Sequence, residues 1–368
     1  MLSAAAAAEV MSGSRIGKSD VPQTRLIANG DVLRVAAVSD YGGAVAILPL
    51  HEHVEPFDVA VPSERLTKVL SSLPADATLG LATEEGALVL SVEGGTARIP
   101  RYAPEAIPED VPPTPETPAA ELEIEAPVLY TAMRNCVGPT SSGDGGASQM
   151  HRSMHLEVTD GRLELMSMHR YAAAYRVALP RERAATGRSS VIVDTTLAVK
   201  TAGQMSGVVR IVLDGEAVWL VSESLHAYIH GLRAKLPVAE MSVLLQREDE
   251  GVKIAATEFA DEMSRVIAAA GDEARVTLTA EQGQIRFAAV TQDVGSYVGV
   301  LACSDGAATL VGGAGYLHRI AASFRGEEIT ISAGADSGPV ILRGQSGAAM
   351  VAQIRAKTDE SPREPKAA

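Results

Sequence analysis

The residues best suited to chemistry are a cysteine and the histidines that follow it. Cys136 with His151 or His155 would supply the thiol and the general base that a thiol hydrolase needs. Such a nucleophile requires surroundings that lower its pKa, but Cys136 ends an apolar helical pattern, and no GxSxG, HExxH or DxD motif accompanies it. We therefore expect a buried structural thiol and a protein that is not an enzyme, with thiol hydrolysis as the enzymatic alternative.

A histidine pair offers a second kind of chemistry, metal binding. His51-Glu52-His53 supplies two imidazoles, but Pro49 and Pro56 flank the segment and the sequence suggests no third ligand. Zinc sites take three or four ligands from the protein. The sequence therefore predicts a surface loop here and no metal.

A third candidate is a motif of the phosphate-binding kind near the start of the chain. Gly17-Lys18-Ser19 follows Gly13, whereas a phosphate-binding loop places four residues between its glycines and joins a strand to a helix. Here three residues separate the glycines, and the motif follows a predicted helix. We expect no nucleotide at this segment and no cofactor elsewhere.

Composition excludes several classes of protein. Lys and Arg number 32 against 46 Asp and Glu, a net charge of −14, which excludes a uniformly basic nucleic-acid binder but not an acidic body with one basic surface. The start has no basic n-region, and no apolar run of membrane-spanning length follows. Two distant cysteines give no disulfide framework. We expect a cytoplasmic protein without a membrane span.

Cations nevertheless recur on the predicted helices and the loops beside them. They are Arg15, Lys18, Arg65, Lys68, Arg134, Arg152, Lys200, Arg265, Arg319 and Arg325. If all the helices face one direction, these side chains form a basic surface that contacts phosphates without reading a base sequence. The alternative is that they are ordinary solvated helix faces, and the residues alone leave both interpretations open.

The elements that carry these cations recur along the chain. Strand patterns at residues 30–38, 160–166 and 282–289 each begin with two turn residues, and they lie about 130 and then about 120 residues apart. Helical patterns at 63–70, 194–200 and 315–320, and closing strands at 87–90, 217–220 and 340–342, repeat at about the same spacings. An opening helix precedes each set, at 2–11, 127–136 and 258–270.

These repeats predict three domains of one α+β fold, each with two helices beside a mostly antiparallel sheet. The expected boundaries are 1–120, 121–244 and 245–357, followed by a flexible tail at 358–368. Residues 104–118 are rich in proline and predict an extended connector between the first two domains, and the second junction is expected near 244–250.

Local motifs and the repeat together point to a family. Residues 190–193 lead into the helix that carries Leu197 and Lys200, residues 235–237 (Lys-Leu-Pro) close the second repeat, and 101–108 form a proline-bearing exit from the first. With three copies of a two-helix domain in an acidic chain, the sequence resembles the bacterial DNA sliding clamp, the beta subunit of DNA polymerase III, including diverged or phage-type copies.

The resemblance implies a function without chemistry. It implies a head-to-tail homodimeric ring in which helices line a central hole around double-stranded DNA and sheets face outward. Such a ring tethers DNA polymerase, and a clamp loader and other replication or repair proteins also bind it through a short, apolar-ended peptide. The alternative is a clamp-fold scaffold or decoy that does not encircle DNA.

The resemblance also implies a partner-peptide groove between the second and third domains. By position it carries onto Met168, Arg170, Tyr171, Ala172, Ala173, Pro237, Met241, Val351, Gln353, Ile354 and Arg355. This sequence departs from the family there, with Met168-His169 at the family's Thr-Asp, Ala172-Ala173 at its Arg-Leu, and Gln353-Ile354 at its Met-Pro. We therefore expect a changed peptide preference.

Overall fold

The computed structural model describes residues 23–39, 41–74, 77–104, 107–138, 152–169, 171–179, 186–246, 250–292, 294–333 and 338–353. These residues fall into two compact units. The first comprises the described residues up to Arg134, together with Arg152–Leu165 and Val177–Lys235. The second comprises residues 135–138, Met166–Arg176 and the described residues from Leu236 onwards.

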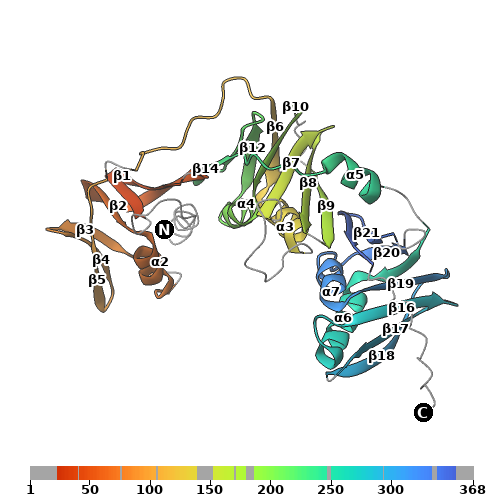
Figure 1. The fold of residues 1–368 in the computed structure, drawn as a ribbon. Helices are drawn as coiled ribbons and strands as arrows, with labels where there is room; N and C mark the ends of the chain where they lie inside the picture. Colours follow the sequence, from red (N-terminus) through yellow and green to blue (C-terminus); the bar gives the residue numbers. More distant parts are fainter. Residues whose placement is uncertain are drawn as a thin grey trace, which may run out of the picture. The chain divides into compact units, whose positions relative to one another are not determined.

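An antiparallel sheet of seven strands runs through the first unit, in the order β1-β2-β14-β13-β12-β6-β10 (Figure 1). The strands are β1 (Gln23–Ser39), β2 (Gly42–Pro62), β14 (Leu225–His230), β13 (Ala217–Val221), β12 (Val208–Leu213), β6 (Ala120–Glu125) and β10 (Thr186–Gly187). Residues 46–42 of β2 pair with 225–229 of β14, so segments far apart in sequence share one sheet. Alternating buried Val, Leu, Ile and Ala side chains form its core.

Further strands and three helices complete the first unit. They are the sheet β3 (Gly80–Glu84), β4 (Ala87–Val92) and β5 (Gly95–Pro100), the pair β7 (Ser153–Thr159) and β11 (Ser189–Asp194), and the helices α2 (Ser63–Ser71), α3 (Ala126–Val137) and α4 (Thr195–Ala202). Leu66 and Leu70 bury one face of α2. Asp194 caps α4 by accepting a hydrogen bond from the Leu197 N–H at 3.0 Å.

The second unit contains two antiparallel strand sets. One is the sheet β18 (Gly295–Ala302), β17 (Gln284–Thr291), β16 (Arg275–Glu281) and β19 (Ala308–Gly313); the other runs β9 (Ala172–Ala178), β22 (Gly347–Val351), β21 (Val340–Gly344), β20 (Glu328–Ala333) and β15 (Val252–Ala255). Helices α6 (Ala256–Ala270) and α7 (Ala314–Ala322) lie side by side (Figure 1). The rings of Phe259 on α6 and Phe287 on β17 meet at 5.5 Å in the core.

The described residues thus hold six helices and antiparallel sheets, an α+β fold as predicted. The helices expected at 63–70, 127–136, 194–200, 258–270 and 315–320 are α2, α3, α4, α6 and α7. The helix expected at 2–11 and the tail at 358–368 lie outside the described residues. No helix among the described residues has the length and apolarity needed to span a membrane.

Two of the three predicted turns have the backbone that tight hairpins need. Asp160 and Gly161 have φ values of 47° and 76°, and Gln282 and Gly283 have 51° and 74°. Two consecutive residues at positive φ form the primed turn that matches the twist of antiparallel strands. Strands β8 (Arg162–His169) and β17 therefore begin after turns where the sequence predicted them.

The prediction for the first of these turns was wrong, and so was the loop at His51–His53. Gly30, at φ 64°, lies inside the continuous strand β1, where the pairing with β2 shifts register. Residues 50–53 of β2 lie opposite this shift, so both histidines belong to an exposed, irregular part of a strand. His53 Nδ1 lies 3.4 Å from Asp31 Oδ1.

Helix α5 (Val238–Gln246) was not predicted. It ends within the region where the sequence indicated a junction. Six of its nine residues are apolar, and Val243 and Leu244 among them are exposed, so the helix lacks the wholly polar outer face that marks a surface helix. Met241 and Leu245 are buried, whereas Val243 is 71 % exposed.

The proline-rich connector is extended, as predicted, with neither helix nor strand at residues 107–119. It is held along its length. Arg25 Nη1 donates to the Ile107 carbonyl at 2.5 Å, Val111 is buried, and Trp219 Nε1 donates to the Pro112 carbonyl at 2.9 Å. The connector therefore packs against the seven-stranded sheet of the first unit through Arg25 on β1 and Trp219 on β13.

Candidate functional site

Cys136 is a structural thiol, as the sequence predicted. It is fully buried, and its Sγ–H donates a hydrogen bond to Ser167 Oγ, at 3.6 Å, or to the Ala174 carbonyl oxygen, at 3.5 Å. Burial raises the pKa of the thiol to about 11, so it stays protonated near neutral pH. His155 is buried on β7, where burial lowers its pKa, and His151 lies outside the described residues.

Within the described ranges, no group of three or more His, Cys, Asp or Glu side chains is arranged to hold a metal ion. Gly13 and Gly17-Lys18-Ser19, the segment that resembles a phosphate-binding loop, lie outside those ranges.

Five of the ten predicted DNA-facing cations lie in ion pairs. The pairs are Lys68–Glu64 (2.6 Å), Arg152–Asp194 (3.3 Å), Arg265–Glu262 (2.7 Å), Arg319–Asp272 (3.9 Å) and Arg325–Asp261 (2.8 Å). A carboxylate this close cancels most of the cation's field at longer range. These positions therefore attract phosphate less than the sequence alone suggested.

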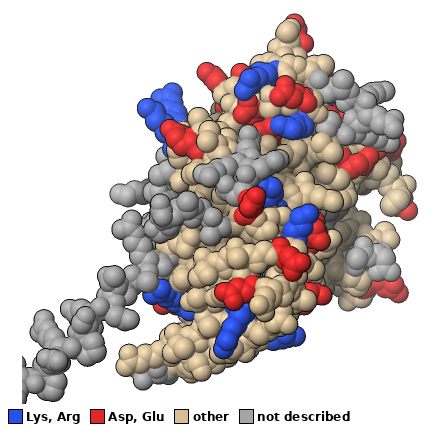
Figure 2. Space-filling model, turned by 90° about the vertical axis from the view of Figure 1, so that its right-hand side faces the viewer, with Lys and Arg blue, Asp and Glu red and all other residues tan. Residues whose placement is uncertain are grey.

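The remaining described cations are Arg65, Arg134 and Lys200, which are exposed and have no carboxylate within 4.0 Å among the described residues. All three belong to the first unit, on α2, α3 and α4. Arg15 and Lys18 lie outside the described ranges. Figure 2 shows one face of the molecule, on which lysine and arginine groups are scattered among aspartate and glutamate groups.

The surface shared by α6 and α7 is an internally bonded network. Ser264 Oγ and His318 Nε2 lie 3.0 Å apart, in a hydrogen bond between the two helices. Buried Glu262 accepts from Tyr297 Oη at 2.6 Å and from Arg265 Nη1 at 2.7 Å. Burial, with the nearby Arg325 guanidinium, lowers the pKa of His318. Much of the polar capacity of this face is thus used within the protein.

Several predicted groove residues gather around the strand pair β9–β22. Ala172 pairs with Val351 and Ala173 with Met350, and the Ala352 N–H donates to the Tyr171 carbonyl at 2.8 Å. Helix α5, which carries Met241 and follows Pro237, packs on β22. Met168 lies half-buried on β8, and Gln353 follows β22. Arg170, Ile354 and Arg355 lie outside the described residues.

Beside Tyr171 lie three residues that sequence reasoning did not assign to the groove, His169, Tyr316 and Arg319. We call these three and Tyr171 the Tyr316 cluster. The Tyr316 ring stacks with His169 at 6.2 Å and meets the Tyr171 ring edge-on at 6.1 Å. Tyr316 Oη lies 3.3 Å from His169 Nδ1. The Arg319 guanidinium carbon lies 4.7 Å from the Tyr316 ring centroid, a cation–π contact.

A buried arginine holds the frame of this cluster together. Arg176 Nη1 donates to the carbonyls of Tyr175 and Ala348, at 2.9 and 3.0 Å, and Nη2 donates to Ser323 Oγ at 2.5 Å. Its guanidinium carbon lies 3.9 Å from the centroid of the Phe324 ring. Burial lowers the pKa of Arg176 to about 10. One side chain thus ties β9 and β22 to the end of α7.

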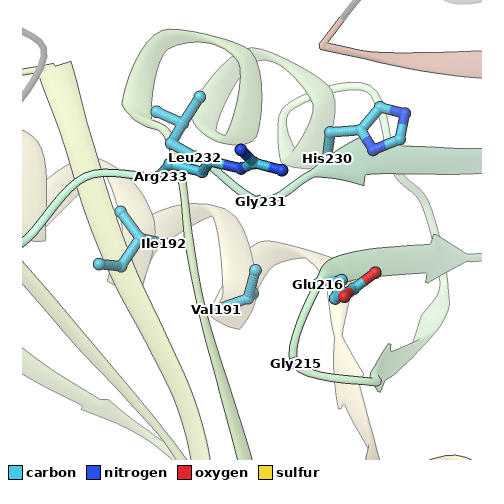
Figure 3. A pocket seen from close by; sticks show the side chains of 8 residues that line it. All are labelled: Val191, Ile192, Gly215, Glu216, His230, Gly231, Leu232 and Arg233. Atoms are coloured by element: carbon cyan, nitrogen blue, oxygen red, sulfur yellow. The ribbon is translucent and has the colours of Figure 1, made fainter.

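A polar cavity of about 510 Å³ opens in the first unit, apart from both predicted sites (Figure 3). Val191 and Ile192 of β11 form one wall, and the turn with Gly215 and Glu216 and the segment after β14 form the others. Glu216, His230 and Arg233 give it an anion, an imidazole and a cation, a mixture that favours no single class of ligand.

No known family model and no curated protein sequence matches this chain. Solved structures do. The DNA polymerase III beta subunit from Thermotoga maritima superposes with a TM-score of 0.80 at 16% identity, covering 96% of this chain and 97% of that one. The corresponding subunit from Pseudomonas aeruginosa gives 0.75 at 16% identity, with coverages of 96% and 97%. The Helicobacter pylori beta clamp bound to a DNA ligase peptide gives 0.77 at 12% identity, with the same coverages.

Sequence identity this low shows the fold, over almost the full length of both chains. The resemblance predicted from the repeats is therefore confirmed at the level of structure: this chain has the fold of the bacterial DNA polymerase III beta sliding clamp.

Proposed function

We propose that the protein is a DNA sliding clamp, a ring that encircles duplex DNA without sequence specificity and tethers DNA polymerase and other replication or repair proteins. The observation that carries the proposal is the match to beta clamps over 96% of the chain. The ring does no chemistry, which fits the protonated, buried Cys136. Its benefit is that a tethered polymerase stays at high effective concentration near the primer end.

The ring would consist of two copies of a chain with three domains, 1–120, 121–244 and 245–357, in the cytoplasm. Helix pairs recur in support of this division: α3 and α4 belong to the second domain, α6 and α7 to the third, and α2 to the first. Contact between unlike ends of two identical chains closes a ring when it occurs twice.

Strand β18 supports such a contact, because it is the edge of its sheet and is apolar on its exposed side. Val298 and Val300 are 61 % and 51 % exposed, and Val290 on the neighbouring strand is 74 % exposed. An unprotected apolar edge normally invites pairing with another strand. We assign it to the partner copy, whose own three-stranded sheet β3-β4-β5 offers free edges.

The DNA path would lie along the helices, where Arg65, Arg134 and Lys200 have no described carboxylate partner. A few loosely spaced cations suit a protein that must hold DNA and still slide, because each phosphate contact adds to a salt-dependent affinity. Partner proteins and a clamp loader would dock through a short peptide on the residues around β9 and β22. That the Helicobacter pylori beta clamp binds a DNA ligase peptide supports docking by peptide.

Retention on closed DNA tests this function. The protein, loaded by its own loader onto nicked circular DNA, should co-elute with the circle in gel filtration at moderate salt. Cutting the circle with a restriction enzyme should release it, because a ring slides off an end. Equal retention on circular and linear DNA, or none on either, would refute encirclement and favour the scaffold alternative. The observation that supports this alternative is the pairing of the cations Arg265 and Arg325 in the second unit with carboxylates.

A further inference from the structure

Arg319 makes no hydrogen bond to a carboxylate among the residues that the structure describes. Its Nε is buried and has no hydrogen-bond partner among the described residues. Its closest carboxylate, Asp272 Oδ2, lies 3.9 Å from Nη1, too far for a hydrogen bond, and the Asp272 side chain is 63 % exposed. A guanidinium normally uses its planar fork of donors to bind a carboxylate at two points. The ion pair within the protein leaves that capacity largely unused.

The guanidinium is nevertheless held in place. It stacks over the Tyr316 ring, which is fixed in turn by His169 through ring stacking and the contact of 3.3 Å between Tyr316 Oη and His169 Nδ1. Stacking restrains the plane of the guanidinium while its N–H groups point outward from the edge of that plane. The Arg319 side chain is 27 % exposed, and because Nε is buried, the terminal Nη groups are the donors that can reach a ligand.

An apolar contact surface lies next to this cation. Tyr171 is 46 % exposed and presents its ring edge-on to Tyr316. The Tyr171 and Tyr316 ring centroids are 6.1 Å apart, and the Tyr316 centroid is 4.7 Å from the Arg319 guanidinium carbon. The Tyr171 ring and the guanidinium carbon are therefore at most about 11 Å apart, a distance that an extended peptide covers in about three residues. One short peptide can therefore touch both.

We propose that the Tyr316 cluster selects partner peptides that carry a carboxylate within about three residues of an apolar anchor, with the anchor against Tyr171 and the carboxylate on Arg319. The inference rests on the proposed function, because it assumes that partners dock on this unit as peptides. It reassigns Arg319 from the DNA path, where the sequence placed it, to the choice of partner.

Three fluorescein-labelled peptides of nine residues, ending in Leu-Phe, test the proposal by fluorescence anisotropy with the full-length protein. The first has Asp three residues before the Phe and an amidated end; the second has Asn there; the third has Asn and a free terminal carboxylate. We expect the Asp peptide to bind about tenfold more tightly than the amidated Asn peptide. Tighter binding of the third peptide would assign the carboxylate to the chain end instead of a side chain.

The Arg319→Gln variant should remove this difference, lowering affinity for the Asp peptide about tenfold and leaving the amidated Asn peptide unchanged. Arg319→Lys, which keeps the charge, should retain a preference for Asp. Arg286→Gln, an exposed cation on β17, is the matched control and should change nothing. Thermal melting verifies that each variant is folded.

Equal affinities of the wild-type protein for all three peptides, an equal loss for all three in Arg319→Gln, or no binding of any would overturn the inference. The DNA-retention assay, run on the same preparations, separates this failure from that of the proposed function. Retention without peptide discrimination refutes only the role of Arg319, whereas discrimination without retention refutes only the clamp.

Discussion

At Arg176 a cation occupies a place in the core that is normally apolar. The side chain is 1 % exposed, and no described carboxylate pairs with it; two carbonyls, one hydroxyl and one aromatic ring provide its environment. A buried charge costs free energy unless its donors are bonded, and here most of them are. Its lowered pKa, about 10, reflects the cost of that burial.

Replacing Arg176 by Met should therefore destabilise the protein. The carbonyls of Tyr175 and Ala348 and the Ser323 hydroxyl would lose their donor, which costs about 2–4 kcal/mol in the free energy of unfolding. Urea denaturation monitored by circular dichroism measures the loss. Arg286→Met, at an exposed position, serves as the control and should stay within about 0.5 kcal/mol of wild type.

Cys136 predicts a dependence of stability on pH. Its pKa is about 11 in the folded protein and 9.0 for a free thiol, so between these values the unfolded chain is ionised and the folded chain is not. The stabilisation is complete below pH 9 and is lost as the pH rises through 11.

Wild type should lose about 1–2 kcal/mol more than Cys136→Ala between pH 8.5 and pH 10.5. Denaturant midpoints at both pH values measure the difference. Parallel curves for the two proteins would mean that the thiol titrates alike in both states. Native Cys136 should also resist a thiol reagent at pH 8 that labels the partly exposed Cys303.

At the scale of elements, cations divide by the helix that carries them. Arg265 on α6, Arg319 on α7 and Arg325 in the turn after α7 each face a carboxylate. Arg65, Arg134 and Lys200 on α2, α3 and α4 do not among the described residues. DNA gains more from an unpaired cation, because no internal partner competes with the phosphate.

Neutralising Arg65, Arg134 and Lys200 together with Gln should shorten retention on circular DNA. The slope of log affinity against log salt should also fall by about 0.9 for each phosphate that a cation no longer neutralises. The triple variant Arg265, Arg319 and Arg325 to Gln should change the slope by much less. Salt titration of retention compares the two sets. A larger effect from the second set would place the DNA against α6 and α7.

The exposed edge β18 predicts a surface that can be disrupted without harm to the fold. Val298→Lys with Val300→Lys should prevent self-association, because two buried ammonium groups would face the incoming strand. Sedimentation should then detect monomers with an unchanged melting temperature. Val243→Lys, at a more exposed valine on α5, is the control and should leave association intact. If the β18 variant still forms dimers, this edge is exposed to solvent and is not the contact between the two copies.

The sequence predicted elements better where the signal was local. Asp160-Gly161 and Gln282-Gly283 were recognisable as turns because positive φ at consecutive residues demands such types. Gly30-Asp31 looks the same, but strand β1 continues there because β2 pairs with it on both sides of the register shift, an effect of residues distant in the sequence. Helix α5 was missed because apolar residues occupy its exposed side as well as its buried side, which removes the amphipathic pattern.

The candidate sites were harder to predict for the same reason. Arg325 and Asp261 are 64 residues apart, so their pairing at 2.8 Å follows from helix packing and not from any motif. Tyr316 lay within a predicted helix, and its approach to His169 depends on the position of β8 beside α7. The one signal in the sequence that could have drawn attention to Tyr316 and Tyr171 is that aromatic residues are rare, at 4% of the chain.

At the scale of the whole molecule, the proposal requires two chains. Light scattering should give twice the chain mass of 38.3 kDa at micromolar concentration, because two arcs of three domains are needed to close a ring. Dilution should show whether the ring reopens. A stable monomer at all concentrations would exclude encirclement by this chain alone and would favour the scaffold that does not encircle DNA.

The docking of the connector gives the protein an optical property of its own. Trp219 is the single tryptophan, it is 6 % exposed, and its indole N–H is bonded to Pro112 in the connector. Its fluorescence is therefore a label-free report on the seating of one segment. An emission maximum that moves to longer wavelength while circular dichroism stays constant would show the connector leaving the sheet in an otherwise folded chain.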